Sequence, residues 1–306
     1  MGAASPVFWS GVVQRNLTPS FTTDVRSLVE SYRPDLLLAE FAPVAAMTTV
    51  KELCHVPLVM TAWASEPGPG AFFDDAMHGA VDEFRASHGL PPMLGRFPVD
   101  HWVVFTPPSW GRIPRKPLAS TLRAHVPAVR SPGWSAPASA GPFVYGTLGT
   151  VYNSRRRLGT FVDAIGLGGW SGLVTVSRTI DPSGFKAWPS VAIEQFVPQA
   201  AVLERADVVV CHGGLGTVLG AIETATPMVI VPLGADQLAN AEIARRLGVA
   251  MVVDPKAAGP EVLRDAIASV LASPSHRSAC EALRDETMAM PAVTDLVGRL
   301  VAAARR

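Results

Sequence analysis

Short runs of apolar, β-branched residues alternate along the chain with segments in which apolar residues recur every three to four positions. The first pattern is typical of buried parallel strands and the second of helices packed on them, so together they predict an α/β fold. In the second half, strands are predicted at 143–148, 173–177, 192–196, 207–211, 228–231 and 249–253. Helices are predicted at 155–165, 199–205, 215–225 and 237–247, and three more between Pro260 and Arg306.

The first half carries a similar but shorter pattern. Helices are predicted at 21–32 and 44–53, strands at 35–39, 57–60 and 101–105, and a loop followed by a helix at 70–88. A nucleotide-binding domain of this class opens on a central strand and a glycine turn. Residues 1–20 offer only a weak apolar patch at 8–13, so we expect the N-terminal domain to be incomplete.

A segment rich in Pro, Gly, Ser and Ala separates the two halves and has no periodicity, which is typical of a linker. The predicted organisation is an N-terminal domain at 1–130, the linker at 131–142 and a second domain at 143–290. A C-terminal amphipathic helix at 291–306 is expected either to pack on the core or to fold back across the linker.

Composition limits the functions open to the chain. Its 306 residues suffice for two ordinary domains, and 26 basic against 26 acidic residues give a formal net charge of zero. We therefore expect no nucleic-acid partner, and no apolar run reaches the roughly 18 residues of a membrane span. Three cysteines without metal-ligand spacing, Cys54, Cys211 and Cys280, predict reduced thiols in a cytoplasmic protein.

The strongest chemical signal is the sequence His-Gly-Gly-Leu-Gly-Thr at 212–217, between a predicted strand and a predicted helix. Such a turn points unpaired backbone N–H groups and the positive end of a helix dipole at one spot, which suits a phosphate or diphosphate. His212, neutral or charged, and the Thr217 hydroxyl add donors. Taken alone, the turn is equally compatible with a tight strand-to-helix connection.

Four segments around this turn decide between these interpretations: 196–199 (Phe-Val-Pro-Gln), 211–217 (Cys-His-Gly-Gly-Leu-Gly-Thr), 224–228 (Thr-Ala-Thr-Pro-Met) and 236–241 (Asp-Gln-Leu-Ala-Asn-Ala). In order and spacing they resemble the donor-binding region of family-one glycosyltransferases. A looser similarity begins at 146–150 (Gly-Thr-Leu-Gly-Thr) and extends across nearly the whole chain, most of all to bacterial enzymes that glycosylate macrolides and other natural products. The resemblance implies the GT-B fold, with two Rossmann-like domains and parallel sheets, and a UDP- or dTDP-sugar donor.

The resemblance also assigns roles. It places Phe196 and Gln199 near the nucleobase and ribose, the glycine turn at the diphosphate, and the Asp-Gln pair at the sugar hydroxyls. Each has a structural alternative, such as a core aromatic for Phe196, a helix cap for His212 or for the Asp-Gln pair, and a surface arginine for Arg178. The residues expected to bind the donor are Arg178, Phe196, Val197, Gln199, His212, Gly213, Gly214, Gly216, Thr217, Asp236 and Gln237.

No Asp-x-Asp pair occurs in the chain. Metal-dependent transferases use such paired carboxylates to hold a divalent cation on the diphosphate. We therefore expect no metal and no cofactor, with the nucleotide sugar as co-substrate.

The resemblance further implies a histidine base in the first strand-to-helix loop, oriented by an acidic residue on a later strand. Glu40 occupies the acidic position, where Asp is usual, but no histidine precedes His55. We expect that the chain lacks the family's N-terminal segment. The alternatives are a shortened homologue that binds a nucleotide sugar or a partner enzyme without transfer, and the use of another residue as base.

The expected acceptor pocket is lined by Trp63, Phe72, Phe73, Met77 and His78, and His78 is also a candidate substitute base. The predicted function is inverting, metal-independent transfer of a sugar to a hydroxyl of an apolar small molecule, by a monomer or homodimer. One alternative is an impaired or auxiliary nucleotide-sugar-binding protein without transfer. Another is a nucleotide-sugar epimerase, for which no acidic and histidine cluster beyond Asp236 is visible.

Overall fold

The computed structural model describes residues 19–40, 43–62, 75–93, 97–111, 121–127, 134, 141–150 and 154–304. They fall into two compact units. The N-terminal unit comprises Met1–Pro107, Gly111–Val126 and Met290–Arg306, and the C-terminal unit comprises Pro108–Trp110 and Pro127–Ala289. Among the described helices, none is both long enough and apolar enough to cross a membrane.

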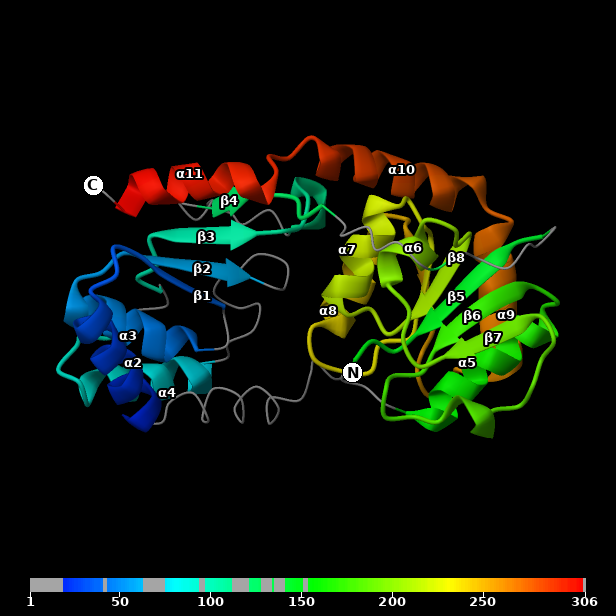
Figure 1. Cartoon of the computed structure of the whole chain (residues 1–306), viewed down its shortest axis with the longest axis horizontal. Helices are drawn as coiled ribbons and strands as arrows, with labels where there is room; N and C mark the ends of the chain where they lie inside the picture. The colour runs from blue at the N-terminus through cyan, green and yellow to red at the C-terminus, as the bar shows by residue number, and fades with distance from the viewer. Residues whose placement is uncertain are drawn as a thin grey trace. The chain divides into compact units, whose positions relative to one another are not determined.

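The N-terminal unit is built on a parallel sheet with the order β1-β2-β3-β4. The strands are β1 (Leu37–Glu40), β2 (Leu58–Ala62), β3 (His101–Val104) and β4 (Thr121–Arg123). Helices α2 (Pro19–Tyr32), α3 (Val44–Cys54) and α4 (Asp75–Ala86) cover one face, and α11 (Val293–Ala304) packs on the other (Figure 1). Leu296 of α11 is buried against Val59 and Val103, so the last helix belongs to this unit.

The C-terminal unit has a parallel sheet with the order β10-β9-β8-β5-β6-β7. The strands are β5 (Phe143–Thr147), β6 (Ser171–Thr175), β7 (Val191–Glu194), β8 (Val208–Cys211), β9 (Met228–Ile230) and β10 (Ala250–Val252). Counted along the unit, this is the Rossmann order, with its switch point between β5 and β8. Strands β5, β8 and β9 are buried along their whole length, because helices cover both faces of the sheet.

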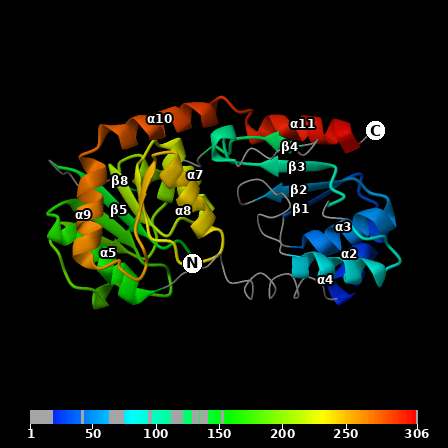
Figure 2. The ribbon, with the colours of Figure 1, turned by 180° about the vertical axis from the view of Figure 1, so that it is seen from behind.

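Two apolar cores lie on the two faces of this sheet. Helices α5 (Arg155–Leu167) and α9 (Pro260–Leu271) pack on one face (Figure 2). The other face carries α6 (Gln199–Leu203), α7 (Leu215–Glu223), α8 (Gln237–Arg246) and α10 (Pro274–Met288).

The predicted strands and helices are present, and three short elements were not predicted. These are β4 and the 3-10 helices at Pro108–Trp110 and Pro182–Gly184. Each spans three residues, too few for a periodic pattern, and β4 is defined only by its pairing with β3. The strand predicted at 192–196 ends at Glu194, so Phe196 lies beyond it.

Candidate functional site

Two turns meet at the carboxyl edge of the C-terminal sheet. Thr147, the last residue of β5, is paired with Cys211, the last residue of β8. The chain then turns at 148–150 after one strand and at 212–214 after the other. Because these strands flank the switch point, this edge is where an open α/β sheet binds its ligand.

The imidazole of His212 lies between the two turns. A Cβ atom added to Gly149 would lie 2.9 Å from His212 Cε1, and one added to Gly214 would lie 2.5 Å from Nε2. Gly149 also has a φ of +68°, which side chains rarely adopt. The close approach of both backbones holds the ring in place and explains why glycine is needed on each side.

Burial lowers the pKa of His212 to about 4, because an imidazolium would lose its hydration. The side chain is 8% exposed. His212 is therefore neutral near pH 7. The sequence had left open whether its side chain is neutral or charged.

Helix α7 begins at the same place. Its N-cap is Gly214, which has no side chain to cap the first turn, and Gly216 in that turn is exposed with open space around its Cα. Backbone N–H groups and the positive helix end are thus directed at the two turns. This arrangement favours a bound anion.

A pocket of about 420 Å³ opens beside the turns, and we call it the β5–β8 pocket. Among the described residues, Arg178 is the one charged side chain in its lining. Its guanidinium carbon lies 4.9 Å from the ring centroid of Phe196, which is 60% exposed. The lining residues are Tyr145, Thr147, Gly149, Thr150, Thr175, Ser177, Arg178, Gln195, Phe196, Val197, Gln199 and Thr217.

Five of the predicted donor-binding residues thus line one pocket: Arg178, Phe196, Val197, Gln199 and Thr217. The exposure of Phe196 contradicts the alternative of a core aromatic, since a ring in a protein core would be covered. The Gln199 side-chain amide donates to Thr217 Oγ1 at 3.1 Å, which joins the start of α6 to the first turn of α7.

The predicted Asp-Gln pair lies beside the pocket lining, at the start of α8. Gln237 Oε1 accepts from the N–H groups of Leu233 and Gly234 at 2.7 and 3.1 Å, so this amide holds the loop before the helix. Asp236 makes no side-chain cap bond, contrary to the capping alternative, and accepts from Asn240 Nδ2 at 2.8 Å.

The carboxyl group of Asp236 is buried, and burial raises its pKa. Hydrogen bonds from Asn240 and from the backbone N–H groups of Asp236 and Leu215 oppose that rise. Leu215 is the first residue of α7. The Asp236 carboxylate therefore lies at the N-terminal end of α7, directly after the glycine turn. Asn240 Nδ2 also donates to the carbonyl of Gly213 at 3.0 Å, which ties α8 to this turn.

Sequence analysis missed the three buried hydroxyl residues of the described pocket lining, Tyr145, Thr147 and Thr175. All three are buried and joined by hydrogen bonds. The signal available was the alternation in 143–147, which places Tyr145 and Thr147 on the same face of β5.

The predicted residues of the N-terminal unit form no described site. Glu40 ends β1 and is exposed. Trp63, Phe72 and Phe73 lie outside the described residues. Met77 and His78 fall within α4, with side chains outside the description.

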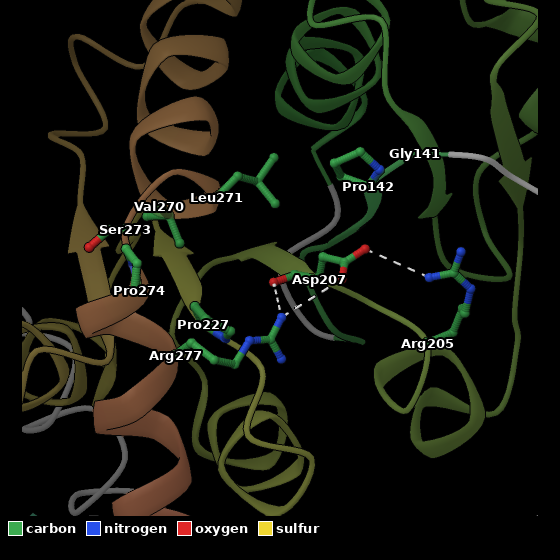
Figure 3. Close-up of a pocket in the computed structure, with 10 residues that line it drawn as sticks. All are labelled: Gly141, Pro142, Arg205, Asp207, Pro227, Val270, Leu271, Ser273, Pro274 and Arg277. Atoms are coloured by element: carbon green, nitrogen blue, oxygen red, sulfur yellow. Dashed lines mark hydrogen bonds and ion pairs between the residues drawn. The ribbon is translucent and has the colours of Figure 1, made fainter.

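A second cavity, of about 560 Å³, lies at the opposite edge of the C-terminal sheet (Figure 3). Asp207 lies between Arg205 and Arg277, at 3.7 and 3.8 Å, and accepts from the Phe143 N–H at 2.8 Å. Arg277 also donates to the carbonyls of Ala225 and Asp207. Because these charged groups already connect chain segments to one another, the cavity is the weaker candidate for a ligand site.

Comparison with protein families matches residues 175–303 to the C-terminal domain of the erythromycin biosynthesis protein CIII-like family. The oleandomycin glycosyltransferase of Streptomyces antibioticus is 33% identical over 145 residues, which are 46% of this chain and 34% of that protein. The 4'-demethylrebeccamycin synthase of Lentzea aerocolonigenes is 28% identical over 227 residues, 72% of this chain and 47% of that protein. The chain thus spans less than half the length of these curated relatives.

Solved structures resemble almost the whole chain. The calicheamicin glycosyltransferase CalG4 has a TM-score of 0.84 at 19% identity, covering 98% of this chain and 80% of its own. The glycosyltransferase VinC, solved in complex with dTDP, has a TM-score of 0.80 at 25% identity, covering 97% of this chain and 79% of its own. These likenesses confirm the predicted α/β fold of the GT-B type.

Proposed function

We propose that the chain, which resembles glycosyltransferases of the GT-B type in sequence and fold, binds a UDP- or dTDP-sugar in the β5–β8 pocket. We propose further that it transfers the sugar, with inversion and without a metal, to a hydroxyl of an apolar natural product. The observation that carries the proposal is the meeting of an exposed aromatic ring, an arginine and a helix N-terminus around one pocket.

In this proposal, Phe196 stacks on the nucleobase, since every base has a π-face that an exposed ring can cover. Arg178, whose guanidinium lines the pocket, contacts a phosphate. The first turn of α7 and the Thr217 hydroxyl direct donors at the diphosphate, whose negative charge grows as the sugar departs. His212 contributes as a neutral hydrogen-bonding group, and its ring packs against the backbones of Gly149 and Gly214.

The sugar hydroxyls are assigned to Asp236 and Gln237. The Asp236 carboxylate lies near the start of α7, where the diphosphate ends and the sugar begins. Gln237 has its Oε1 engaged with the loop, so its Nε2 group is the part left to donate to a sugar hydroxyl. A carboxylate and an amide together discriminate between sugar hydroxyl configurations.

Sugar transfer also needs a base for the acceptor hydroxyl. Glu40 is proposed to orient it, as the family pattern implies, and the acceptor is proposed to contact the aromatic segment at 63–78. A second candidate function is nucleotide-sugar binding without transfer. It is supported by Glu40 itself, which has no histidine partner among the residues that the structure describes.

The two candidates are distinguished by one pair of measurements on the full chain. Calorimetric titration with UDP and dTDP should show saturable binding of at least one of them, and no binding of either would refute both candidates. Incubation with a UDP- or dTDP-sugar and a macrolide aglycone, followed by mass spectrometry, should then show glycosylated product. The yield should not change when EDTA is added. Binding without product would support the second candidate.

A further inference from the structure

Three hydroxyl groups in the lining of the β5–β8 pocket, which the proposed function does not use, are joined in a series of hydrogen bonds. Tyr145 Oη lies 3.0 Å from Thr175 Oγ1, and Thr175 Oγ1 donates to Thr147 Oγ1 at 3.0 Å. The N–H of Gly149, in the turn that contacts His212, also donates to Thr147 Oγ1, at 3.1 Å. The series of hydrogen bonds therefore runs from Tyr145, inside the sheet, to Gly149, in the turn that follows β5.

Each hydroxyl has one hydrogen, so the direction of the chain can be worked out. Thr175 gives its hydrogen to Thr147, and therefore accepts from Tyr145. Thr147 Oγ1 accepts two hydrogen bonds, from Thr175 and from Gly149. Among the described residues, its own hydrogen makes no hydrogen bond of adequate geometry, and the side chain, 3% exposed, lines the pocket.

Gln199 orients a second hydroxyl of the pocket. Its NH₂ group donates to Thr217 Oγ1 at 3.1 Å. Thr217 Oγ1 therefore accepts, which leaves the Thr217 hydrogen for a partner in the pocket.

We propose that Tyr145 is a positioning residue: its hydroxyl orders a series of hydrogen bonds, through Thr175, that presents the Thr147 O–H to a phosphate oxygen of the bound nucleotide. The inference rests on the proposed function, because it requires a nucleoside diphosphate in this pocket. Phosphate oxygens at neutral pH only accept, so they match a site whose free hydroxyl hydrogens all point outward.

Burial makes this orientation persistent. Tyr145 and Thr175 are 2% and 8% exposed, so water does not compete for their hydrogen bonds. Burial also raises the pKa of Tyr145 above its ordinary value, so the phenol keeps its hydrogen near neutral pH. A donor oriented before the ligand arrives needs no reorganisation on binding.

The test compares variants of the full chain by calorimetric titration with UDP or dTDP and, by NMR, with the nucleoside alone. Tyr145→Phe and Thr175→Val remove one link each, and Thr175→Ser retains the hydroxyl. Thr226→Val is the matched control: Thr226 is also buried and hydrogen-bonded, to Leu203 O at 3.2 Å, but lies outside the pocket lining. Thermal melts show whether each variant folds.

We expect Tyr145→Phe and Thr175→Val to weaken diphosphate binding about tenfold, the range for a hydrogen bond to a charged group. Nucleoside binding should be unchanged, because only the phosphate contact depends on the chain. Thr175→Ser should restore diphosphate affinity, and Thr226→Val should not alter it. The inference is overturned if the wild type binds the diphosphate and the first two variants match Thr226→Val, or if they weaken nucleoside and diphosphate equally. No diphosphate binding by the wild type would instead overturn the proposed function.

Discussion

Replacement of Gly149 by alanine tests the packing of His212 most directly. The new Cβ would lie 2.9 Å from His212 Cε1 and 3.3 Å from Nε2, closer than carbon atoms approach in folded proteins. The ring has little room to move away, because the Gly214 backbone also approaches it closely: a Cβ added to Gly214 would lie 2.5 Å from Nε2. Gly149→Ala should therefore displace the imidazole and the turn together.

The same protein contains a matched control. Gly169, in the connection between α5 and β6, has the same φ of +68°, but an added Cβ would meet nothing within 4 Å. Both substitutions carry the cost of a left-handed alanine, about 1–2 kcal/mol. Only Gly149→Ala adds the cost of overpacking a filled site, about 1–3 kcal/mol more.

The assay is a thermal melt together with titration by UDP or dTDP. For a unit of this size, about 1 kcal/mol lowers the melting temperature by roughly 2–4 °C. We expect Gly149→Ala to melt at least about 2 °C below Gly169→Ala. Nucleotide affinity should fall in Gly149→Ala alone. Equal melting temperatures and equal affinities in the two variants would refute the packing of His212 between the turns.

Two further predictions concern the C-terminal unit. Because the pKa of His212 is about 4 in the folded state and about 6.5 unfolded, the unfolded chain binds the extra proton. The free energy of unfolding should therefore fall as pH drops from about 6.5 to about 4 and stay level above that range, with a shallower fall in His212→Gln. A denaturation series over pH checks this, and identical slopes for both proteins would contradict it. Arg277→Ala should lower stability by about 1 kcal/mol, because it removes two hydrogen bonds to carbonyls and a long, half-exposed ion pair. Nucleotide affinity should stay the same, and a changed affinity would indicate that the second cavity communicates with the first.

The sequence predicted the architecture well because the strands of the C-terminal unit are buried on both faces. Buried strands such as β8 appear as continuous β-branched runs, and glycine marks the turns that follow them. The position of the pocket also followed from the motif at 212–217, since a strand, a glycine turn and a helix fix where backbone donors point.

Other properties of the site could not be obtained from the pattern. The neutrality of His212 depends on burial between two turns that are far apart in sequence. Tyr145 and Thr175 belong to different strands, and only the β5–β6 register brings their hydroxyls together. The sequence pattern predicts Gln237 as a sugar-binding residue, yet its side-chain carbonyl oxygen accepts a hydrogen bond from Leu233 in the preceding loop. Each case depends on a contact between neighbouring elements, which local periodicity does not encode.

The pairing of β5 with β8 has a consequence for how the unit unfolds. These strands are central neighbours but belong to opposite halves of the unit, and the pocket draws on both, with Thr217 and the start of α7 coming from the second half. A ligand that binds the assembled pocket and not the unfolded chain stabilises the entire unit through mass action. Protease cleavage even at the outer strands β7 and β10 should slow as nucleotide is added, so proteolytic resistance reports occupancy of the pocket.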